Sequence, residues 1–161
     1  MDQATGLRNV VKMQHSGQTP QARVLTITSG KGGVGKSNMA VNLAVQLSRL
    51  GKKVIIFDAD IGLANVEVMF GSIPKYNLSD VLYKGMAMRD IISNGPMDIG
   101  FISGGSGIVE LNNLTKEQIM TIVSKLSELD SMADVILIDT GAGISDSVME
   151  FVIASPEVLL I

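Results

Sequence analysis

The stretch Ser29–Asn38, with the sequence SGKGGVGKSN, restricts the fold of this chain more than any other segment. It matches the pattern Gly-x-x-x-x-Gly-Lys-Ser at Gly30, Gly35, Lys36 and Ser37. An apolar, strand-like run precedes it, and a segment with helical spacing of apolar residues follows it. Glycines let backbone N–H groups face a phosphate, and a helix N-terminus adds partial positive charge. The sequence therefore predicts a phosphate-binding loop between a strand and a helix.

Strand-like and helix-like patterns alternate along the rest of the chain. The expected strands are Val24–Thr28, Lys53–Phe57, Ile99–Ser103, Val135–Ile138 and Val158–Ile161. The expected helices are Ser37–Leu50, Asn65–Phe70, Leu78–Tyr83, Met88–Ile92, Thr115–Leu129 and Ser145–Ala154. This alternation predicts an α/β fold, the three-layer sandwich of a P-loop NTPase, in which a mostly parallel sheet carries helices on both faces. Ligands of such sheets bind at the carboxyl ends of the strands.

Composition excludes several classes of protein. The 161 residues are enough for one domain, and 46% of them are hydrophobic. A net charge of −3 argues against a basic surface for nucleic acid. The sequence contains no cysteine, which excludes disulfides, cysteine-ligated zinc and iron–sulfur clusters within it. Neither a secretion signal nor an apolar run of membrane-spanning length is present, so we expect a cytoplasmic location.

Five side chains are candidates for nucleotide chemistry. Lys36 is expected to reach the β- and γ-phosphates, and the Ser37 hydroxyl to bind Mg²⁺. Asp139 follows an apolar strand, as the Walker B aspartate near Mg²⁺ does, although strands also end in aspartate for turn reasons. Asp58 and Asp60 end the second expected strand and lie on one face of an extended segment. One could hold a metal-bound water and the other orient the attacking water. The alternative is a solvated acidic loop.

Lys31 is a second lysine in the same loop, and spacing alone leaves two interpretations open, a solvated side chain or a charge supplied to another phosphate. The stretch Lys31–Ser37 resembles the deviant Walker A motif of the MinD/ParA ATPases. Three further segments resemble family segments in the same order, and the likeness covers Arg23–Ile161. They are FDADIGLANVEVMFG (Phe57–Gly71), LSDVL (Leu78–Leu82) and LIDTGAGI (Leu137–Ile144).

The resemblance implies an ATPase that forms a face-to-face homodimer with ATP, in which Lys31 reaches the partner's nucleotide. It assigns ATP or ADP with Mg²⁺ to the loop residues Gly30, Lys31, Gly32, Gly33, Val34, Gly35, Lys36, Ser37 and Asn38. It implies catalytic roles for Lys31, Lys36 and Asp60. Ser37, Asp58 and Asp139 are the implied residues around the metal.

Residues 1–22 are polar, and we expect them to form a flexible segment ahead of an ATPase domain at 23–161. The sequence DQATGLR (Asp2–Arg8) is similar to the N-terminal motif of the flagellar-number regulators, the branch that includes FlhG, FleN and YlxH. This resemblance implies that the segment activates a partner flagellar GTPase of the signal-recognition type, and components of the flagellar C-ring switch are further candidate partners. The residues of the motif are Asp2, Gln3, Ala4, Leu7 and Arg8, and Gln3 matches the activating glutamine. On composition alone, the segment would be interpreted as a disordered tail.

Two departures from the family pattern stand out. Gly141 occupies a position where the family more often has proline, which loosens the turn after Asp139. The sequence stops at the apolar run Pro156–Ile161, so we expect a fragment of a longer protein. The family's adenine-recognising segment and C-terminal amphipathic membrane-binding helix would follow it. The parent protein is then expected at the inner face of the cell membrane.

Three classes of function remain. The first is an ATP-dependent dimerising switch that controls flagellar number or placement, with a MinD-type cell-division-site or ParA-type cargo-positioning ATPase as the alternative. The second is a metal or cluster carrier of the related iron-protein branch, which the lack of cysteine disfavours. The third is an interaction module that acts through residues 1–22 alone.

Overall fold

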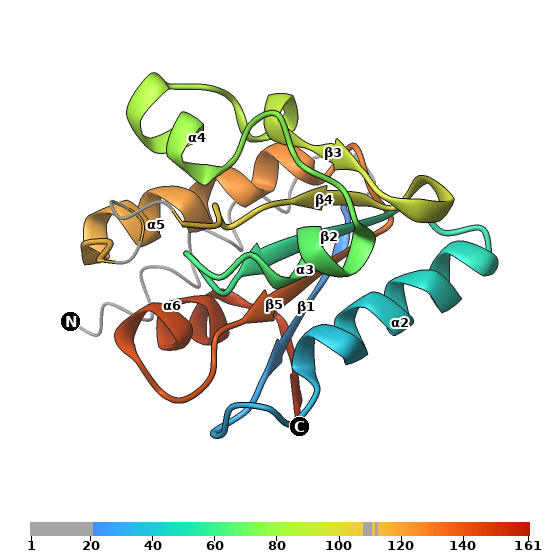
Figure 1. Cartoon of the computed structure of the whole chain (residues 1–161), viewed down its shortest axis with the longest axis horizontal. Helices are drawn as coiled ribbons and strands as arrows, with labels where there is room; N and C mark the ends of the chain where they lie inside the picture. The colour runs from blue at the N-terminus through green and yellow to red at the C-terminus, as the bar shows by residue number, and fades with distance from the viewer. Residues whose placement is uncertain (1–20, 108–110, 112) are drawn as a thin grey trace.

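The computed structural model describes residues 21–107, 111 and 113–161. These residues form a six-stranded sheet with the order β3-β4-β2-β5-β1-β6 (Figure 1). The strands are β1 (Arg23–Thr28), β2 (Val54–Ala59), β3 (Ser93–Asn94), β4 (Gly100–Ile102), β5 (Val135–Thr140) and β6 (Glu157–Leu160). Every neighbouring pair is parallel except β3 and β4. The predicted mostly parallel sheet is therefore confirmed.

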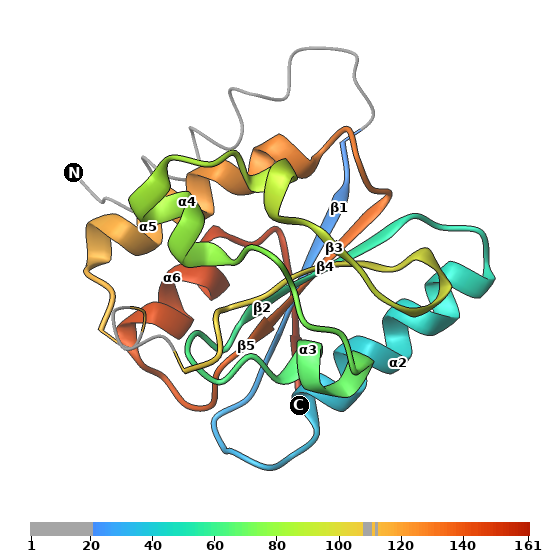
Figure 2. The same ribbon diagram turned by 45° about the horizontal axis from the view of Figure 1, so that its top comes forward.

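Helices cover both faces of the sheet, as the sequence predicts. On one face lie α2 (Lys36–Arg49) and α3 (Asn65–Phe70). On the other lie α4 (Leu78–Lys84), the 3₁₀ helix η2 (Met88–Ile91), α5 (Lys116–Lys125) and α6 (Asp146–Ala154) (Figure 2). Across the part of the chain that the structure describes, no helix combines the length and apolar character needed to cross a membrane.

The element boundaries differ from the expected ones in a few places. The short antiparallel strand β3 and the 3₁₀ helix η3 (Pro96–Asp98) are not predicted from sequence, because two or three residues carry no readable period. The expected helix 115–129 is an α-helix up to Lys125 and a 3₁₀ helix, η5 (Leu126–Leu129), beyond it. Its predicted capping box is confirmed, since the side chains of Thr115 and Gln118 each accept the other's backbone N–H.

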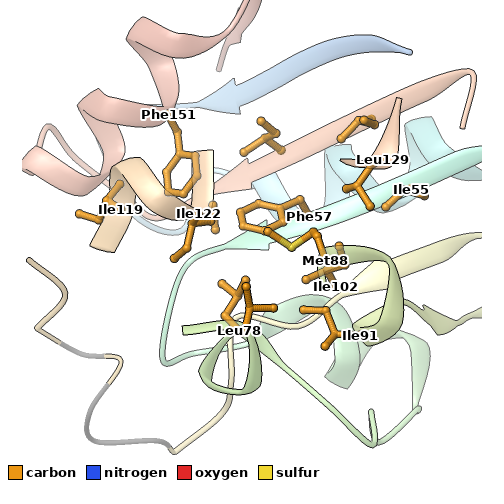
Figure 3. Packing of buried hydrophobic residues seen from close by; sticks show 14 of the residues in the cluster. Ile55, Phe57, Leu78, Met88, Ile91, Ile102, Ile119, Ile122, Leu129 and Phe151 are labelled. Carbon is orange, nitrogen blue, oxygen red and sulfur yellow. The ribbon is translucent and has the colours of Figure 1, made fainter. Parts of the chain in front are cut away.

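The alternation of side chains along β2 divides the core into two clusters. Ile55 and Phe57 pack under α4, α5 and α6, whereas Val54 and Ile56 pack under α2. In the first cluster the ring of Phe57 lies 5.6 Å from that of Phe151 on α6, centroid to centroid (Figure 3). Because β2 is buried on both faces, its position in the sheet, and that of the acidic residues at its end, is strongly constrained.

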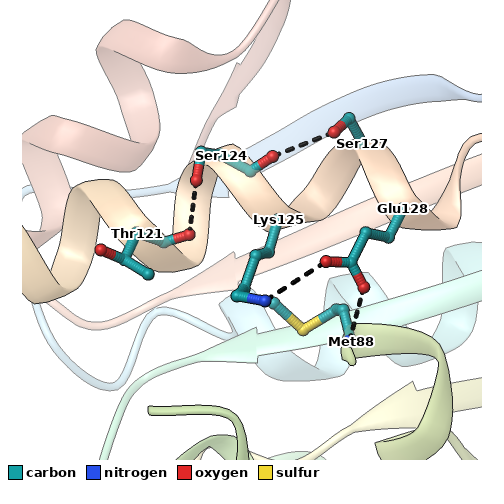
Figure 4. A network of polar contacts seen from close by, with 6 residues as sticks. All are labelled: Met88, Thr121, Ser124, Lys125, Ser127 and Glu128. Carbon is teal, nitrogen blue, oxygen red and sulfur yellow. Dashed lines mark hydrogen bonds and ion pairs between the residues drawn. The ribbon is translucent and has the colours of Figure 1, made fainter. Parts of the chain in front are cut away.

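Glu128 in η5 joins the helical layer to η2. Its Oε2 accepts the backbone N–H of Met88 at 2.8 Å, and its Oε1 lies 3.4 Å from the ammonium of Lys125 (Figure 4). Met88 is fully buried in the first core cluster. The carboxylate thus satisfies a donor at the first residue of a short helix and fixes η2 against η5.

The strand order brings three chain segments to one edge of the sheet. From β1 the chain crosses to β2 and β4, and then returns to place β5 between β2 and β1. Asp139 on β5 is in register with Ile27 on β1 and with Asp58 on β2. In open α/β sheets, ligands bind at the carboxyl edge where the strand order reverses. The loop after β1 and both aspartates lie at that edge.

Candidate functional site

The glycine loop connects β1 to α2, and no side chain among the described residues caps the N-terminus of this helix. Gly33 and Gly35 have φ angles of 71° and 99°, a region that favours glycine. Gly35 is the N-cap of α2, no side chain caps the helix, and its first turn contains no acidic residue. By contrast, side chains cap α4, α5 and α6. The first-turn N–H groups of α2 are therefore available to an anion.

The two lysines of the loop have different environments. Lys36, the first residue of α2, is buried, with 8% of its surface exposed. Its positive charge lowers the pKa of Asp139, so the two side chains lie near each other. Lys31 is exposed and makes no ion pair with another residue that the structure describes. One lysine belongs to the interior of the site, and the other stands at its surface.

Asp139 is a buried carboxyl group without a regular hydrogen bond. Neither of its oxygens has a partner within normal distance and angle limits among the described residues. Burial raises its pKa to about 6, and the negative charge of Asp60 acts in the same direction. Ser37 is close enough for its hydroxyl to lower the pKa, as Lys36 does. Such an unsatisfied buried carboxylate is unusual, and a bound ligand would account for it.

Asp58 is also buried, but its carboxylate is hydrogen-bonded. Its Oδ1 accepts the backbone N–H of Asp60 at 3.2 Å, and its Oδ2 accepts that of Val66 at 2.9 Å. Burial, together with the negative charges of Asp139 and Asp60, raises the pKa of Asp58 to about 7, against the effect of the two backbone donors. Asp58 thus organises the loop between β2 and α3 as well as facing Asp139.

Asp60 lies in that loop, directly after β2, and is partly exposed. Its Oδ2 accepts a hydrogen bond from Nδ2 of Asn65 at 2.8 Å. Its Oδ1 faces Gly141, where an added Cβ would lie only 3.0 Å from this oxygen. Sequence reasoning assigned no role to Asn65, although the residue falls within the family-like segment Phe57–Gly71. The position of Asn65 at the start of a short expected helix, soon after Asp60, is the sequence signal that could have indicated this contact.

The loop after β5 contacts the glycine loop directly. The N–H of Gly143 donates to the carbonyl of Ser29 at 3.0 Å, and a Cβ at Gly32 would touch Ala142. The hydroxyl of Thr140 donates to the carbonyl of Ile27 at 3.0 Å. The phosphate-binding segment and the segment after Asp139 are therefore held together by one backbone hydrogen bond, one hydroxyl hydrogen bond and close packing.

A pocket of about 380 Å³ lies beside the acidic residues, on the side of α5 and α6. Asp60 and Gly141 belong to its wall, and so do Lys116 and Glu150, which form an ion pair 2.9 Å apart. No residue of the glycine loop lines it. Asp60 therefore lies between this pocket and the rest of the site.

The predicted residues thus fall into two groups. The structure brings together Lys36, Ser37, Asp58, Asp60 and Asp139, which influence one another electrostatically. The predicted partner-activating residues lie outside the described residues. They are Asp2, Gln3, Ala4, Leu7 and Arg8. Ala22, which the expected boundary places in the tail, packs into the first core cluster.

A comparison with models of protein families decides the classification of the chain. Residues 21–159 match the ParA family, described as an NUBPL iron-transfer P-loop NTPase. The chain belongs to the ParA/MinD family of P-loop NTPases. Both the motifs in the sequence of this family member and its mostly parallel sheet are consistent with that classification.

Individual relatives of this ParA/MinD-type chain agree with the classification. The antiactivator FleN of Pseudomonas aeruginosa is 41% identical, over 92% of this chain and 53% of its own length. The flagellum site-determining protein YlxH of Helicobacter pylori is 38% identical, over 86% of this chain and 47% of its own. The septum site-determining protein MinD of Pyrococcus horikoshii, solved with Mg-ADP, superposes with a TM-score of 0.76 and 27% identity, over 87% of this chain and 57% of its own. The chain therefore spans about half the length of these relatives.

The residues of this ParA/MinD-type site suit Mg²⁺. Serine hydroxyl and aspartate oxygens are the hard donors that Mg²⁺ prefers. Both oxygens of Asp139 are buried and have no hydrogen-bond partner among residues 21–107, 111 and 113–161. Among the described residues, no group of three or more His, Cys, Asp or Glu side chains forms a closed metal site. Mg²⁺ at nucleotide sites binds through one or two protein groups together with phosphate oxygens and waters, so an open donor set is what such a site requires.

Proposed function

We propose that this chain is the nucleotide-binding part of an ATPase that acts as an ATP-dependent dimerising switch. The observation that carries the proposal is the glycine loop at the uncapped N-terminus of α2, with the buried side chains of Lys36 and Asp139 beside it. A nucleotide's phosphates would supply the negative charge that this arrangement favours. The Mg-ADP in the P. horikoshii relative supports ATP or ADP with Mg²⁺ as the ligands.

Each residue of the loop then has a defined task. Backbone N–H groups of residues 30–38 bind phosphate oxygens, and the ammonium of Lys36 binds the β- and γ-phosphates. The hydroxyl of Ser37 and the carboxylates of Asp58 and Asp139 hold the metal or its waters. Mg²⁺, when bound, neutralises charge on the phosphate oxygens. Because both oxygens of Asp58 already accept backbone N–H groups, Asp139 is the carboxylate more available to hold the metal.

Hydrolysis needs a group that orients the attacking water. Asp60 is partly exposed beside Asp139. Its Oδ2 is bonded to Asn65, and its Oδ1 can accept a hydrogen bond from a water. Lys31, exposed on the loop, is the candidate to reach the nucleotide of a second copy of the chain. A positive charge supplied across a dimer would act as an arginine finger does. These roles make hydrolysis depend on dimerisation.

For the complete protein, we propose control of flagellar number or placement. The likeness to FleN and to the flagellum site-determining protein YlxH supports this role. In this proposal Asp2, Gln3, Ala4, Leu7 and Arg8 activate a flagellar GTPase of the signal-recognition type, and C-ring switch components are further partners. The likeness to MinD supports a second candidate, selection of the cell-division site, and a ParA-type cargo-positioning role belongs to the same class.

Iron transfer, which the family description names, is less well supported by this portion of the protein. The 161 residues contain no cysteine, so no thiolate within them can bind an iron–sulfur cluster. We also propose a cytoplasmic location, with the complete protein at the inner face of the membrane. This proposal rests on the family resemblance.

Calorimetric titration with Mg·ADP tests the proposed nucleotide site on this chain. Lys36→Ala removes a cation bonded to phosphate, and charge-assisted hydrogen bonds of this kind are worth about 1.5–3 kcal/mol. The affinity should therefore fall by about tenfold or more. Lys52→Ala, an exposed lysine beyond the far end of α2, is the matched control and should bind normally. Equal affinity of the two variants would contradict the site.

A further inference from the structure

Two successive residues of α3 donate hydrogen bonds to two acidic residues, one near the end of β2 and one directly after it. Nδ2 of Asn65 donates to Oδ2 of Asp60 at 2.8 Å, and the N–H of Val66 donates to Oδ2 of Asp58 at 2.9 Å. The backbone closes the same loop, because the N–H of Leu63 donates to the carbonyl of Asp60 at 3.1 Å. The position of the Asp60 carboxylate is therefore set by α3 and not only by the end of β2.

The opposite side of the Asp60 carboxylate is bounded by Gly141. A Cβ at this position would lie 3.0 Å from Oδ1 of Asp60 and 3.6 Å from its Cγ, closer than most side-chain contacts. Gly141 is buried, so the carboxylate has little room to turn toward it. Asn65 fixes one oxygen, and the backbone at Gly141 limits the movement of the other.

The contact with Asp60 explains an asparagine at this position better than the needs of the helix end do. Asn65 is the first residue of α3, where an aspartate would favour the helix N-terminus more, through the helix dipole. Only the amide, however, donates a hydrogen bond to a neighbouring carboxylate. A neutral donor also adds no positive charge beside the Asp60 carboxylate, as a lysine would. Because Asn65 occupies only Oδ2 of Asp60, Oδ1 of Asp60 remains available as a hydrogen-bond acceptor.

We propose that Asn65 is a positioning residue for ATP hydrolysis, which holds Oδ2 of Asp60 so that Oδ1 faces the attacking water. This inference rests on the proposed function, in which Asp60 orients that water. Asn65 itself does not touch the nucleotide in this proposal. Its loss should therefore change the turnover number, kcat, and leave nucleotide affinity almost unchanged.

The test uses the complete natural protein that contains this sequence. Asn65→Asp keeps the shape of the side chain and suits the helix end, but it removes the donor and adds a repelling charge. We expect kcat for Mg·ATP to fall by about tenfold or more, since a hydrogen bond to a charged group is lost. Affinity for Mg·ADP should change by less than about twofold. Asn94→Asp, at an exposed position on β3, is the matched control and should retain full activity.

A double-mutant cycle separates positioning from general stability. Asn65→Ala should lower kcat in the unsubstituted background but have no further effect in an Asp60→Ala background, because it acts through that carboxylate. An equal loss in both backgrounds, or normal kcat for Asn65→Asp, would overturn the inference while leaving the proposed ATPase intact. If the unsubstituted protein binds Mg·ATP but does not hydrolyse it even as a dimer, the proposed function and this inference fail together.

Discussion

Asp58 and Asp139 occupy paired positions on the neighbouring parallel strands β2 and β5, and both carboxyl groups are buried. Burial raises the pKa of Asp58 to about 7 and that of Asp139 to about 6. The negative charge of Asp139 contributes to the raised pKa of Asp58. Two ionised groups in this arrangement repel each other in the absence of a cation, and this repulsion lowers the stability of the ligand-free fold. The same two charges favour the binding of a metal ion together with a nucleotide.

Asp139→Asn should stabilise the ligand-free protein at pH 8. The folded pKa of about 6 lies above the ordinary value of about 3.9, so the folded state binds the proton more tightly than the unfolded chain does. Stability from this group is therefore present at low pH and is lost as the pH rises through about 4 to 6. Removing the charge should raise the free energy of unfolding at pH 8 by about 1–3 kcal/mol, with little gain below pH 4.

Urea unfolding at several pH values measures this effect. Asp90→Asn, which changes an exposed aspartate in η2, is the control and should not alter the pH dependence. If Asp139→Asn is as stable as the unsubstituted protein at pH 8, burial does not penalise this carboxylate as we infer.

Lys31→Ala should leave the nucleotide site of a single chain intact. Its side chain is exposed on the glycine loop, while Lys36 provides the buried charge. We therefore expect normal Mg·ADP affinity by calorimetry in this chain. In the complete protein, the variant should lose ATP-dependent dimerisation, measured by light scattering, and with it hydrolysis. A loss of ADP binding as large as that of Lys36→Ala would exclude the role across the dimer.

Glu128→Ala should destabilise the fold by about 1–3 kcal/mol, because the buried end of η2 loses its acceptor for the Met88 N–H. Lys125→Ala removes only the ion pair with the other carboxylate oxygen, 3.4 Å away, and should cost less than about 1 kcal/mol. Chemical denaturation of both variants measures the difference. Equal stability losses would show that the ion pair, not the backbone hydrogen bond, is what matters.

A peptide spanning residues 1–18 should speed GTP hydrolysis by the proposed flagellar GTPase without ATP and without the folded domain. Gln3 is the residue on which the effect should depend, since an amide can donate and accept hydrogen bonds at once and so orient a water. Gln3→Ala should abolish the stimulation, measured as phosphate release, and Lys36→Ala in the complete protein should leave it intact. An inert peptide combined with a stimulating folded domain would place the activating surface on the ATPase fold.

The sequence by itself determined the phosphate-binding loop and the class of fold. The loop depends on glycine conformations and a Lys-Ser pair within ten consecutive residues, and the helical and strand periods around it are equally local. The family-like segments predicted the acidic residues at the carboxyl ends of β2 and β5. Only the tertiary structure decided how these residues meet.

The insertion of β5 between β2 and β1 places Asp139 in register with Asp58, although the two lie 81 positions apart in the chain. No local period encodes that strand order, because it results from packing both faces of the sheet. The same holds for the missing hydrogen bonds of Asp139 and for Gly141 beside Asp60, which depend on neighbours from distant segments. Chemistry that resides in one short segment can be read from sequence, whereas burial and close approach are properties of the assembled core.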